Sequence, residues 1–334
     1  MTALNLGDLS QSFSLRQRNT SLKMEMDRLT TELASGQVAE VRQVLAGNYG
    51  YLTEIERKLD LLGNYNVATT EAGYFTEAIQ NSLGRVEELS TTLSASLLTA
   101  GTSAIGVSGS DTVAEARNTL EAMIGAFNTD VAGRYLFSGT ATDQRPLLDA
   151  DDLLADLRTA ISGATTPDAM IADAKAWFDA PTGFAAVIYQ GATDALAPFA
   201  LSQTENVTLD IRATDPKIYD VLRLTALAAL ADDPVFGLDI AGQSELFGKT
   251  GQQMLGAKDD IIALRAEVGF VEARIDQINT RNAAEITSLE YARTALLEAD
   301  PYETATRLED VQFQLQSLYA VTVRSSQLSL VNFL

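Results

Sequence analysis

Two short segments have residue types that could bind phosphate or a metal ion. Gly248, Lys249 and Thr250 match the end of a phosphate-binding P-loop, in which backbone N–H groups and the lysine hold the phosphates. That loop also needs a glycine five positions before its second glycine, where the chain has Gln243. We therefore set the phosphate-binding interpretation aside.

The second segment is acidic. Asp149, Asp151 and Asp152 resemble the first ligands of a calcium loop, which binds the ion through closely spaced carboxylates. Leu153 and Leu154 occupy later ligand positions, and no glycine follows them. This pattern is more typical of an acidic turn at the start of a helix, so we expect no metal site here.

The overall composition removes most catalytic chemistry. The 334 residues include no cysteine and no histidine, which excludes thiolate zinc sites, disulfides and imidazole acid–base catalysis. Asp plus Glu number 45 against 24 Lys plus Arg, and the formal charge of −21 disfavours nucleic acid and anionic lipid as partners. We expect a structural or interaction protein with no catalytic residues, no metal and no cofactor. The alternative is an enzyme that uses Mg²⁺ and carboxylates in the middle of the chain.

The sequence shows no signal for membrane insertion. The N-terminus has neither a basic region nor an apolar one, so we expect no cleaved signal peptide. The most apolar stretch, Val221 to Leu230, contains Arg223 and is much shorter than the ~20 residues that a membrane span needs.

Proline divides the chain, because it breaks the interior of a helix. Six of the seven prolines lie between 146 and 234, which leaves the two flanking regions free to form long helices. We expect a mainly α fold, a long antiparallel helical bundle or coiled coil built from both chain ends, with an inserted small α+β domain. The expected parts are terminal helices at 1–35 and 301–334, a helical core domain at 36–145 and 250–300, and an inserted outer domain at 146–249.

The strongest helical pattern lies at 254–299, where apolar residues recur every seven positions. Asn282 and Glu285 interrupt this pattern. They either fix the register of the helix or are polar residues exposed to solvent with no structural role. A second helical stretch covers Leu52–Leu98, with a polar middle at 64–70. The predicted core seam of the long helix consists of Ile261, Val268, Ile275, Leu289 and Leu296.

Both chain ends carry a narrow apolar stripe of coiled-coil type. The first stripe ends at Ser35-Gly36, and the second helix restarts at Asp300-Pro301 with an N-cap and a proline at its first position. These stripes either cover each other, pack against neighbouring molecules, or form an ordinary internal core. As a candidate assembly interface we identify Leu15, Leu22, Met26, Leu29, Leu33, Leu308, Val311, Leu315, Leu318 and Leu328.

The remaining elements are shorter. We expect a loop at 101–110, followed by a helix capped by Ser110-Asp111 that carries Leu120 and Phe127 on one face. Within the middle of the chain we expect helices at 151–161 and 169–178, and extended segments at 185–189 and 207–212.

These features resemble the bacterial flagellin superfamily, and within it the branch of hook–filament junction proteins known as hook-associated protein 3. A glycine–arginine–tyrosine motif stands at the position where proteins of that family pass from the N-terminal helices into the inserted segment. Tyr189-Gln190-Gly191 is similar to a motif of that insert. Leu328–Leu334 is similar to the usual C-terminal sequence of the junction proteins. The segment 37–47 departs from the family pattern. The residues of the first motif are Gly133, Arg134, Tyr135, Phe137, Ser138 and Gly139.

The resemblance implies a function in motility. It implies a secreted structural subunit of the bacterial flagellum, exported without a cleaved signal, that forms the hook–filament junction by helical or ring self-assembly through its terminal helices. Its implied partners are other axial proteins, namely the hook-side junction protein and flagellin, together with an export chaperone. The alternatives are a filament flagellin and, from the coiled-coil pattern alone, a cytosolic adaptor.

Overall fold

The computed structural model describes residues 4–41, 49–102 and 109–331, with side chains from 10 to 324 within those ranges. The chain is mainly α, as the sequence predicted, and it divides into two compact units. One unit contains Met1–Leu62 and Ala284–Leu334, and the other contains Gly63–Ala283. The three-part division expected from the prolines stays a prediction.

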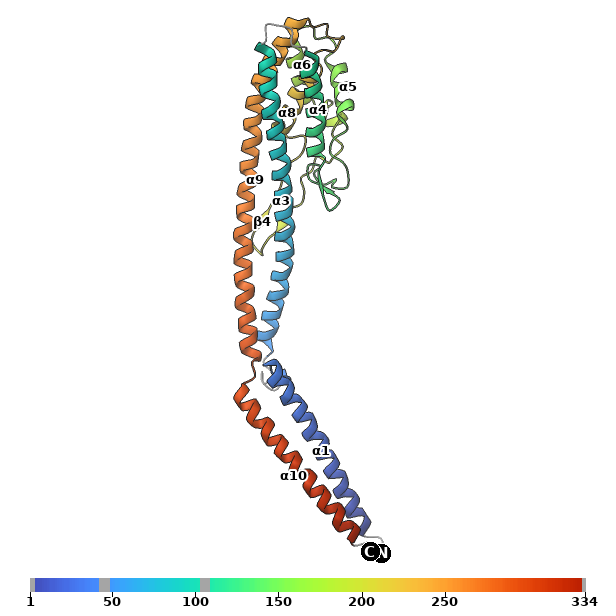
Figure 1. The fold of residues 1–334 in the computed structure, drawn as a ribbon, viewed down its shortest axis with the longest axis vertical. Helices are drawn as coiled ribbons and strands as arrows, with labels where there is room; N and C mark the ends of the chain where they lie inside the picture. Colours follow the sequence, from blue (N-terminus) through green and yellow to red (C-terminus); the bar gives the residue numbers. More distant parts are fainter. Residues whose placement is uncertain (1–3, 42–48, 103–108, 332–334) are drawn as a thin grey trace. The chain divides into compact units, whose positions relative to one another are not determined.

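In the first unit, two terminal helices lie side by side and antiparallel (Figure 1): α1 (Leu4–Ser35) and α10 (Pro301–Val331). Helix α1 ends as predicted, because Gly36 adopts a φ of +68°, which glycine tolerates without strain. Helix α10 begins at Pro301, where Asp300 Oδ1 accepts the N–H groups of Tyr302 (2.8 Å) and Glu303 (3.1 Å). The predicted N-cap is confirmed.

Two longer helices, α3 (Gly50–Thr102) and α9 (Ile240–Leu297), contribute residues to both units. Within the second unit they are antiparallel: Gln80 Nε2 donates to the Arg265 carbonyl at 2.7 Å, and Gly101 lies against Gly248. The polar stretch 64–70 does not interrupt α3. Ile261, Val268 and Ile275 are buried on α9, whereas Leu289 and Leu296 are half-buried.

Helix α9 begins fourteen residues before the heptad pattern predicted, at Ile240 instead of 254. The segment that resembled a P-loop is therefore helical. Lys249 forms ion pairs with Asp168 (2.5 Å) and Glu245 (2.7 Å), and the Thr250 hydroxyl donates to the Leu246 carbonyl. A phosphate loop is excluded, because its N–H groups are not free to bind in a helix interior.

Helix α4 (Gly109–Phe127) carries a buried face that includes Leu120, Met123 and Phe127. The predicted N-cap at Ser110-Asp111 is wrong, because the chain is already helical at Gly109. The loop predicted at 101–110 is helical at 101–102, and its residues 103–108 lie outside the described ranges.

The middle of the chain combines short helices with two small antiparallel hairpins. The hairpins pair β1 (Asp130–Val131) with β2 (Arg134–Tyr135), and β3 (Phe199–Ala200) with β4 (Asn206–Val207). The helices are α5 (Ala150–Ala160), α6 (Pro167–Asp179), α7 (Phe184–Val187) and α8 (Pro216–Ala229).

The predictions for this region are partly right. The helices expected at 151–161 and 169–178 correspond to α5 and α6. The strand expected at 185–189 is wrong, because Phe184 starts a helical turn and is buried against the rings of Phe178 and Tyr219. Of 207–212 only Val207 lies in a strand, since β4 pairs with β3 over two residues.

The middle of the chain shares one apolar core with the long helices. Helix α8 is buried at every position from Val221 to Ala229 and packs on α4. The same cluster continues to Leu83 on α3 and to Ile261 on α9. Because α8 covers the apolar face of α4, the segment 146–249 contributes to the folding of the second unit.

The polar break at Asn282 has a structural explanation. Asn282 is buried, and its Nδ2 donates to the carbonyl oxygen of Leu201 in the β3–β4 hairpin at 3.0 Å. On the same hairpin, Glu205 forms ion pairs with Arg274 (2.7 Å) and Arg281 (2.6 Å). Asn282 therefore binds the hairpin and is not a solvent-exposed break in the apolar pattern.

We predict that Gly101→Ala lowers the free energy of unfolding by about 1–3 kcal/mol, because an added methyl overpacks this helix crossing. A Cβ at Gly101 would lie 2.6 Å from the backbone of Gly248. Gly256→Ala is the control, because its Cβ meets nothing within 4 Å, and it should leave stability unchanged or raise it by up to ~1 kcal/mol. Denaturant unfolding measures both, and equal stabilities of the two variants would contradict this packing.

We predict that Asn282→Ala costs about 1–3 kcal/mol, because it leaves the Leu201 carbonyl without its hydrogen bond. Thr280→Ala, on the exposed face of α9, is the control and should change stability by less than ~0.5 kcal/mol. Amide exchange should accelerate in the β3–β4 hairpin of the Asn282 variant alone. Unchanged exchange there would show that Asn282 does not hold the hairpin.

Candidate assembly interface

The terminal helices are held together by a small apolar seam. Leu29 on α1 is 1% exposed, and it packs in one cluster with Val311 and Leu315 of α10. Leu22, Met26 and Leu308 are half-buried against this cluster. The spacing of these positions places each set on one face of its helix, so two stripes from opposite ends of the sequence cover each other.

The other residues of the candidate interface lie around this seam. Leu318 is buried, Leu15 is half-buried, and Leu33 is 41% exposed. The side chain of Leu328 lies outside the described ranges. The predicted stripes are thus largely occupied within one chain, and their role in assembly stays a prediction.

Sequence reasoning missed a second set of apolar residues on the same two helices. Phe13 and Met24 on α1 are 65% and 62% exposed, and Tyr302 and Phe313 on α10 are 83% and 71% exposed. Each pair is eleven residues apart, which is about 20° around a helix, and Phe313 lies about 160° from Val311. These outer faces point away from the seam. The eleven-residue spacing of these side chains is present in the sequence. The prediction assigned only one apolar stripe to each helix, with 4-3 spacing, and these residues lie outside that stripe.

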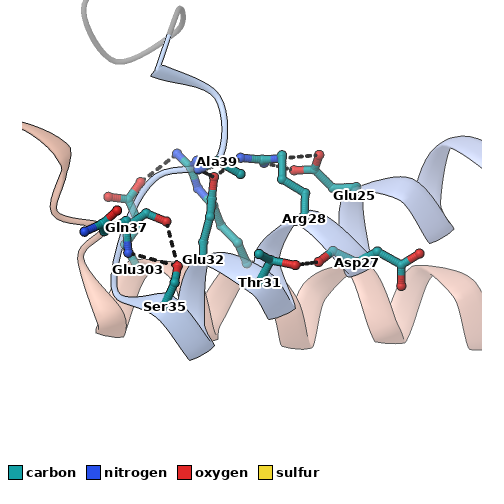
Figure 2. A network of polar contacts seen from close by, with 10 residues as sticks. Glu25, Asp27, Arg28, Thr31, Glu32, Ser35, Gln37, Ala39 and Glu303 are labelled. Atoms are coloured by element: carbon teal, nitrogen blue, oxygen red, sulfur yellow. Dashed lines mark hydrogen bonds and ion pairs between the residues drawn. The ribbon is translucent and has the colours of Figure 1, made fainter.

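A polar network holds the segment where α1 ends. Figure 2 shows Glu32 between Arg28 and Ala39. The Glu32 carboxylate is nearly buried at 5% exposure and accepts from Arg28 Nη1 (2.8 Å) and from the backbone N–H of Ala39 (2.9 Å). Arg28 also donates to Glu25, with Nε to Oε2 at 3.1 Å. Side chains of α1 thereby fix the chain just beyond the helix.

The two connections of the first unit are also tied to each other. The Ala299 N–H donates to the Gly36 carbonyl (3.0 Å), and the Val38 N–H donates to the Leu297 carbonyl (2.8 Å). Gln37 and Glu298 form an isolated antiparallel bridge between them. The segment 37–47, where the sequence departs from the flagellin pattern, therefore begins with a backbone link to the connection between α9 and α10. Its residues 42–47 lie outside the described ranges.

The ion pair of α1 shifts two ionisation equilibria. The hydrogen bond from Arg28 lowers the pKa of Glu25 below 4.5, with partial burial opposing it. The same hydrogen bond between Arg28 and Glu25 raises the pKa of Arg28, because it favours the charged guanidinium. Ionised Glu25 is thus favoured in the folded chain.

The motif residues build local structure in the second unit. Gly133 has a φ of +79° in the β1–β2 turn, where its N–H donates to Asp130 Oδ2 at 2.9 Å. Arg134 forms an ion pair with Glu71 and lies 4.8 Å from the centre of the Phe75 ring. Tyr135 is half-buried, and the Phe137 ring meets the Phe127 ring edge-on with centroids 5.3 Å apart.

The two family motifs contact each other. The Ser138 carbonyl accepts the N–H of Ala192 at 2.9 Å, and the Tyr189 hydroxyl donates to the Ala192 carbonyl at 2.9 Å. Gly139 has a φ of +62°, and a Cβ there would lie 2.6 Å from the Ala192 carbonyl oxygen. These residues are therefore positioned as a packed junction of two loops.

Neither a cluster of metal ligands nor a membrane-spanning helix occurs among the described residues. In these ranges no three acidic, histidine or cysteine side chains gather in a way that could hold a metal ion. Nor does any helix there have a stretch both long and apolar enough to cross a membrane. The acidic residues at 149–152 instead begin α5, with Asp149 at its N-cap position and 3.1 Å from Arg145.

The C-terminal part of the chain matches a known family. Residues 253–334 match the family model described as the bacterial flagellin C-terminal helical region, which here comprises most of α9 and all of α10. No curated protein is similar enough in sequence to count as a match.

Two solved structures are similar to the chain. A putative flagellar hook-associated protein from Vibrio parahaemolyticus is 15% identical with a TM-score of 0.48, over 72% of this chain and 94% of that one. FlgL from Bacillus cereus is 14% identical with a TM-score of 0.39, over 84% of this chain and 99% of that one.

We predict that Glu32→Ala destabilises the end of α1 by about 1–3 kcal/mol, because it leaves the Ala39 N–H without an acceptor. Glu32→Gln is the matched variant, since its amide oxygen can still accept that bond, and it should cost less. Amide exchange at Ala39 reports the effect directly. The same exchange rate in both variants would refute the role of the side-chain oxygen.

We predict that the Glu25–Arg28 pair stabilises the fold only above acidic pH. Because the folded pKa of Glu25 is lowered, its contribution is present above pH ~4.5 and is lost as the pH falls through the folded pKa. Glu25→Gln should lower the melting temperature by about 1–3 °C at pH 7 and by less at pH 3. Arg28→Gln should cost more than Glu25→Gln, because it also removes the hydrogen bond to Glu32. Adding Glu25→Gln to Arg28→Gln should change the stability little further; a loss in Glu25→Gln that is independent of pH would contradict the pair.

Proposed function

We propose that this chain is a structural subunit of the bacterial flagellum. The premise is that residues 253–334 match the bacterial flagellin C-terminal family. The place of this chain would be the junction between hook and filament. The observation that carries the proposal is that the matched region contains α10, whose partner helix α1 comes from the opposite end of the chain. The two ends therefore form one structural element.

The α1–α10 pair leaves apolar side chains exposed to solvent, which favours assembly with neighbouring subunits. Among the side chains that the structure describes on these two helices of 32 and 31 residues, the apolar cluster between them has three buried members, Leu29, Val311 and Leu315. Helices in proteins owe most of their stability to the packing of an apolar face. Phe13, Met24 and Phe313 remain on the outer faces, and contact with neighbouring subunits would bury them.

The same reasoning assigns the parts of the chain to an assembly. The terminal helices at 1–35 and 301–334 would pack against neighbours as the inner layer, and the helical core and the segment 146–249 would lie outside them. The partners proposed are the hook-side junction protein, flagellin and further copies of this chain, with an export chaperone before assembly. Export would use the flagellar channel, without a cleaved signal, to the cell exterior.

Two other functions are weighed against this one. A filament flagellin would share the C-terminal family and the paired ends, so only the position in the flagellum separates it from a junction protein. A cytosolic adaptor would not need the aromatic outer faces of α1 and α10. The proposal assigns no catalysis, since the candidate residues for phosphate and metal binding lie in a helix and at a helix start.

The test combines location with one surface variant. Antibody labelling of isolated flagella should mark a narrow zone next to the hook, whereas a filament flagellin would label the whole length. Phe313→Asp should fold, because the side chain is 71% exposed, but should be lost from the flagella.

Gln314→Asp introduces the same charge at the next exposed position and is the control that should still be incorporated. Labelling confined to the cytosol would contradict a flagellar role. Normal incorporation of both variants would contradict the outer face of α10 as an assembly surface.

A further inference from the structure

A groove in the second unit has an apolar lining and no occupant within the described chain. It lies between α3 and the β1–β2 hairpin, has a volume of about 430 Å³, and includes the exposed side chains of Val67 (69%) and Tyr74 (61%). Its two charged members pair with each other, because Arg134 forms an ion pair with Glu71, and Arg134 also lies over the Phe75 ring. The open surface is therefore mainly apolar.

An acidic groove adjoins it and shares Tyr74. Between α3 and α9 it has a volume of about 400 Å³ and is lined by Glu77, Glu272 and Asp276 among others. In the described chain no lysine or arginine forms an ion pair with these three carboxylates. Burial and the charges of Asp276 and Glu77 raise the pKa of Glu272, and the charge of Arg265 opposes this rise only in part.

The opposite side of α9 has the complementary character. Phe270 is 78% exposed, and Arg274 and Arg281 follow it at about 40° and 20° around the helix. Phe270 lies about 160° around α9 from Glu272. The guanidinium groups of both arginines share the carboxylate of Glu205. This face therefore combines a protruding aromatic ring with two cations and one anion.

We propose that the Phe270 face of one copy docks onto the Tyr74 groove of a second copy of this chain. The inference rests on the proposed function, because it supplies a lateral contact for the assembly proposed there. Phe270 would enter the apolar groove beside Val67 and Tyr74. The arginines next to it would face the carboxylates of Glu77, Glu272 and Asp276.

Charge complementarity identifies a second copy as the occupant. The formal charge of the chain is −21, so a generic contact between two copies would be repulsive. This pairing brings a locally basic aromatic face to an acidic apolar groove, which favours one orientation. Phe270 lies about 160° around α9 from Glu272, which lines the adjoining acidic groove, so Phe270 cannot reach that groove within its own chain.

A contact between two different faces continues from copy to copy. Such heterologous contacts generate rings if the rotation closes and helical filaments if it does not. The proposed pairing is therefore the type of contact that an axial subunit needs, and it involves no residue of the terminal helices.

The absence of native cysteine permits a direct test by cross-linking full-length chains. Phe270→Cys and Val67→Cys are prepared separately, mixed at a concentration where the wild-type chain self-associates by light scattering, and oxidised. A covalent heterodimer should form in the mixture, and each variant alone should give few dimers. Ile240→Cys, at a similarly exposed position (70%), replaces Phe270→Cys in the control mixture and should form few dimers with Val67→Cys.

A second measurement uses surface variants that should fold normally. Phe270→Ser and Glu77→Lys should each weaken self-association at least about tenfold, as removal of a central contact does. Val235→Ser, at another exposed apolar site of the same unit, should not weaken it.

The inference is overturned if the heterodimer is no more abundant than in the control mixture, or if the wild-type chain does not self-associate up to its solubility limit. These outcomes are independent of the position of the protein in flagella. Correct labelling next to the hook without cross-linking would reject the docking alone, and cross-linking without flagellar labelling would reject the proposed function alone.

Discussion

The apolar seams that join segments from opposite ends of the chain hold this structure together. Leu29 meets Val311 and Leu315 across almost the whole sequence, and the long helices pair over a shorter separation, which is 185 residues between Gln80 and Arg265. Each of these helices has an apolar face that must be covered, and the antiparallel partner from the other end covers it. As a consequence, the segment 109–239 begins and ends near the same point of the long helices, since Gly109 lies against the side chain of Gln243.

Two buried polar residues within this apolar framework form hydrogen bonds to the backbone of neighbouring segments. Asn282 interrupts the seam of α9 where the β3–β4 hairpin docks, and its amide bonds the Leu201 carbonyl. Glu32 is nearly buried at the end of α1 because it accepts a backbone N–H beyond the helix. In both places a polar group is buried together with its hydrogen-bond partner, which avoids most of the cost of desolvation.

Periodicity in the sequence predicted the long elements, because a helix needs only a repeated apolar position and clear ends. Gly36 and Asp300-Pro301 marked those ends correctly. The shorter elements were harder, since Phe184 is placed by the rings around it and β4 by a two-residue pairing with β3. The outer faces of α1 and α10 were missed because eleven-residue spacing is a weak signal beside a heptad. The docking role of Asn282 depends on a residue 81 positions away, which no local pattern reveals.

The central claim is that the terminal helices pair within one chain but are completed by neighbouring subunits. Amide hydrogen exchange of the full-length chain, as a monomer and in assembled flagella, tests it directly. In the monomer, amides in Leu22–Leu33 and Leu308–Leu318 should exchange faster than those in Val268–Ile278, since the small α1–α10 seam opens more easily. In the assembly all three segments should be protected. Equal protection of the three segments in a verified monomer would contradict the account.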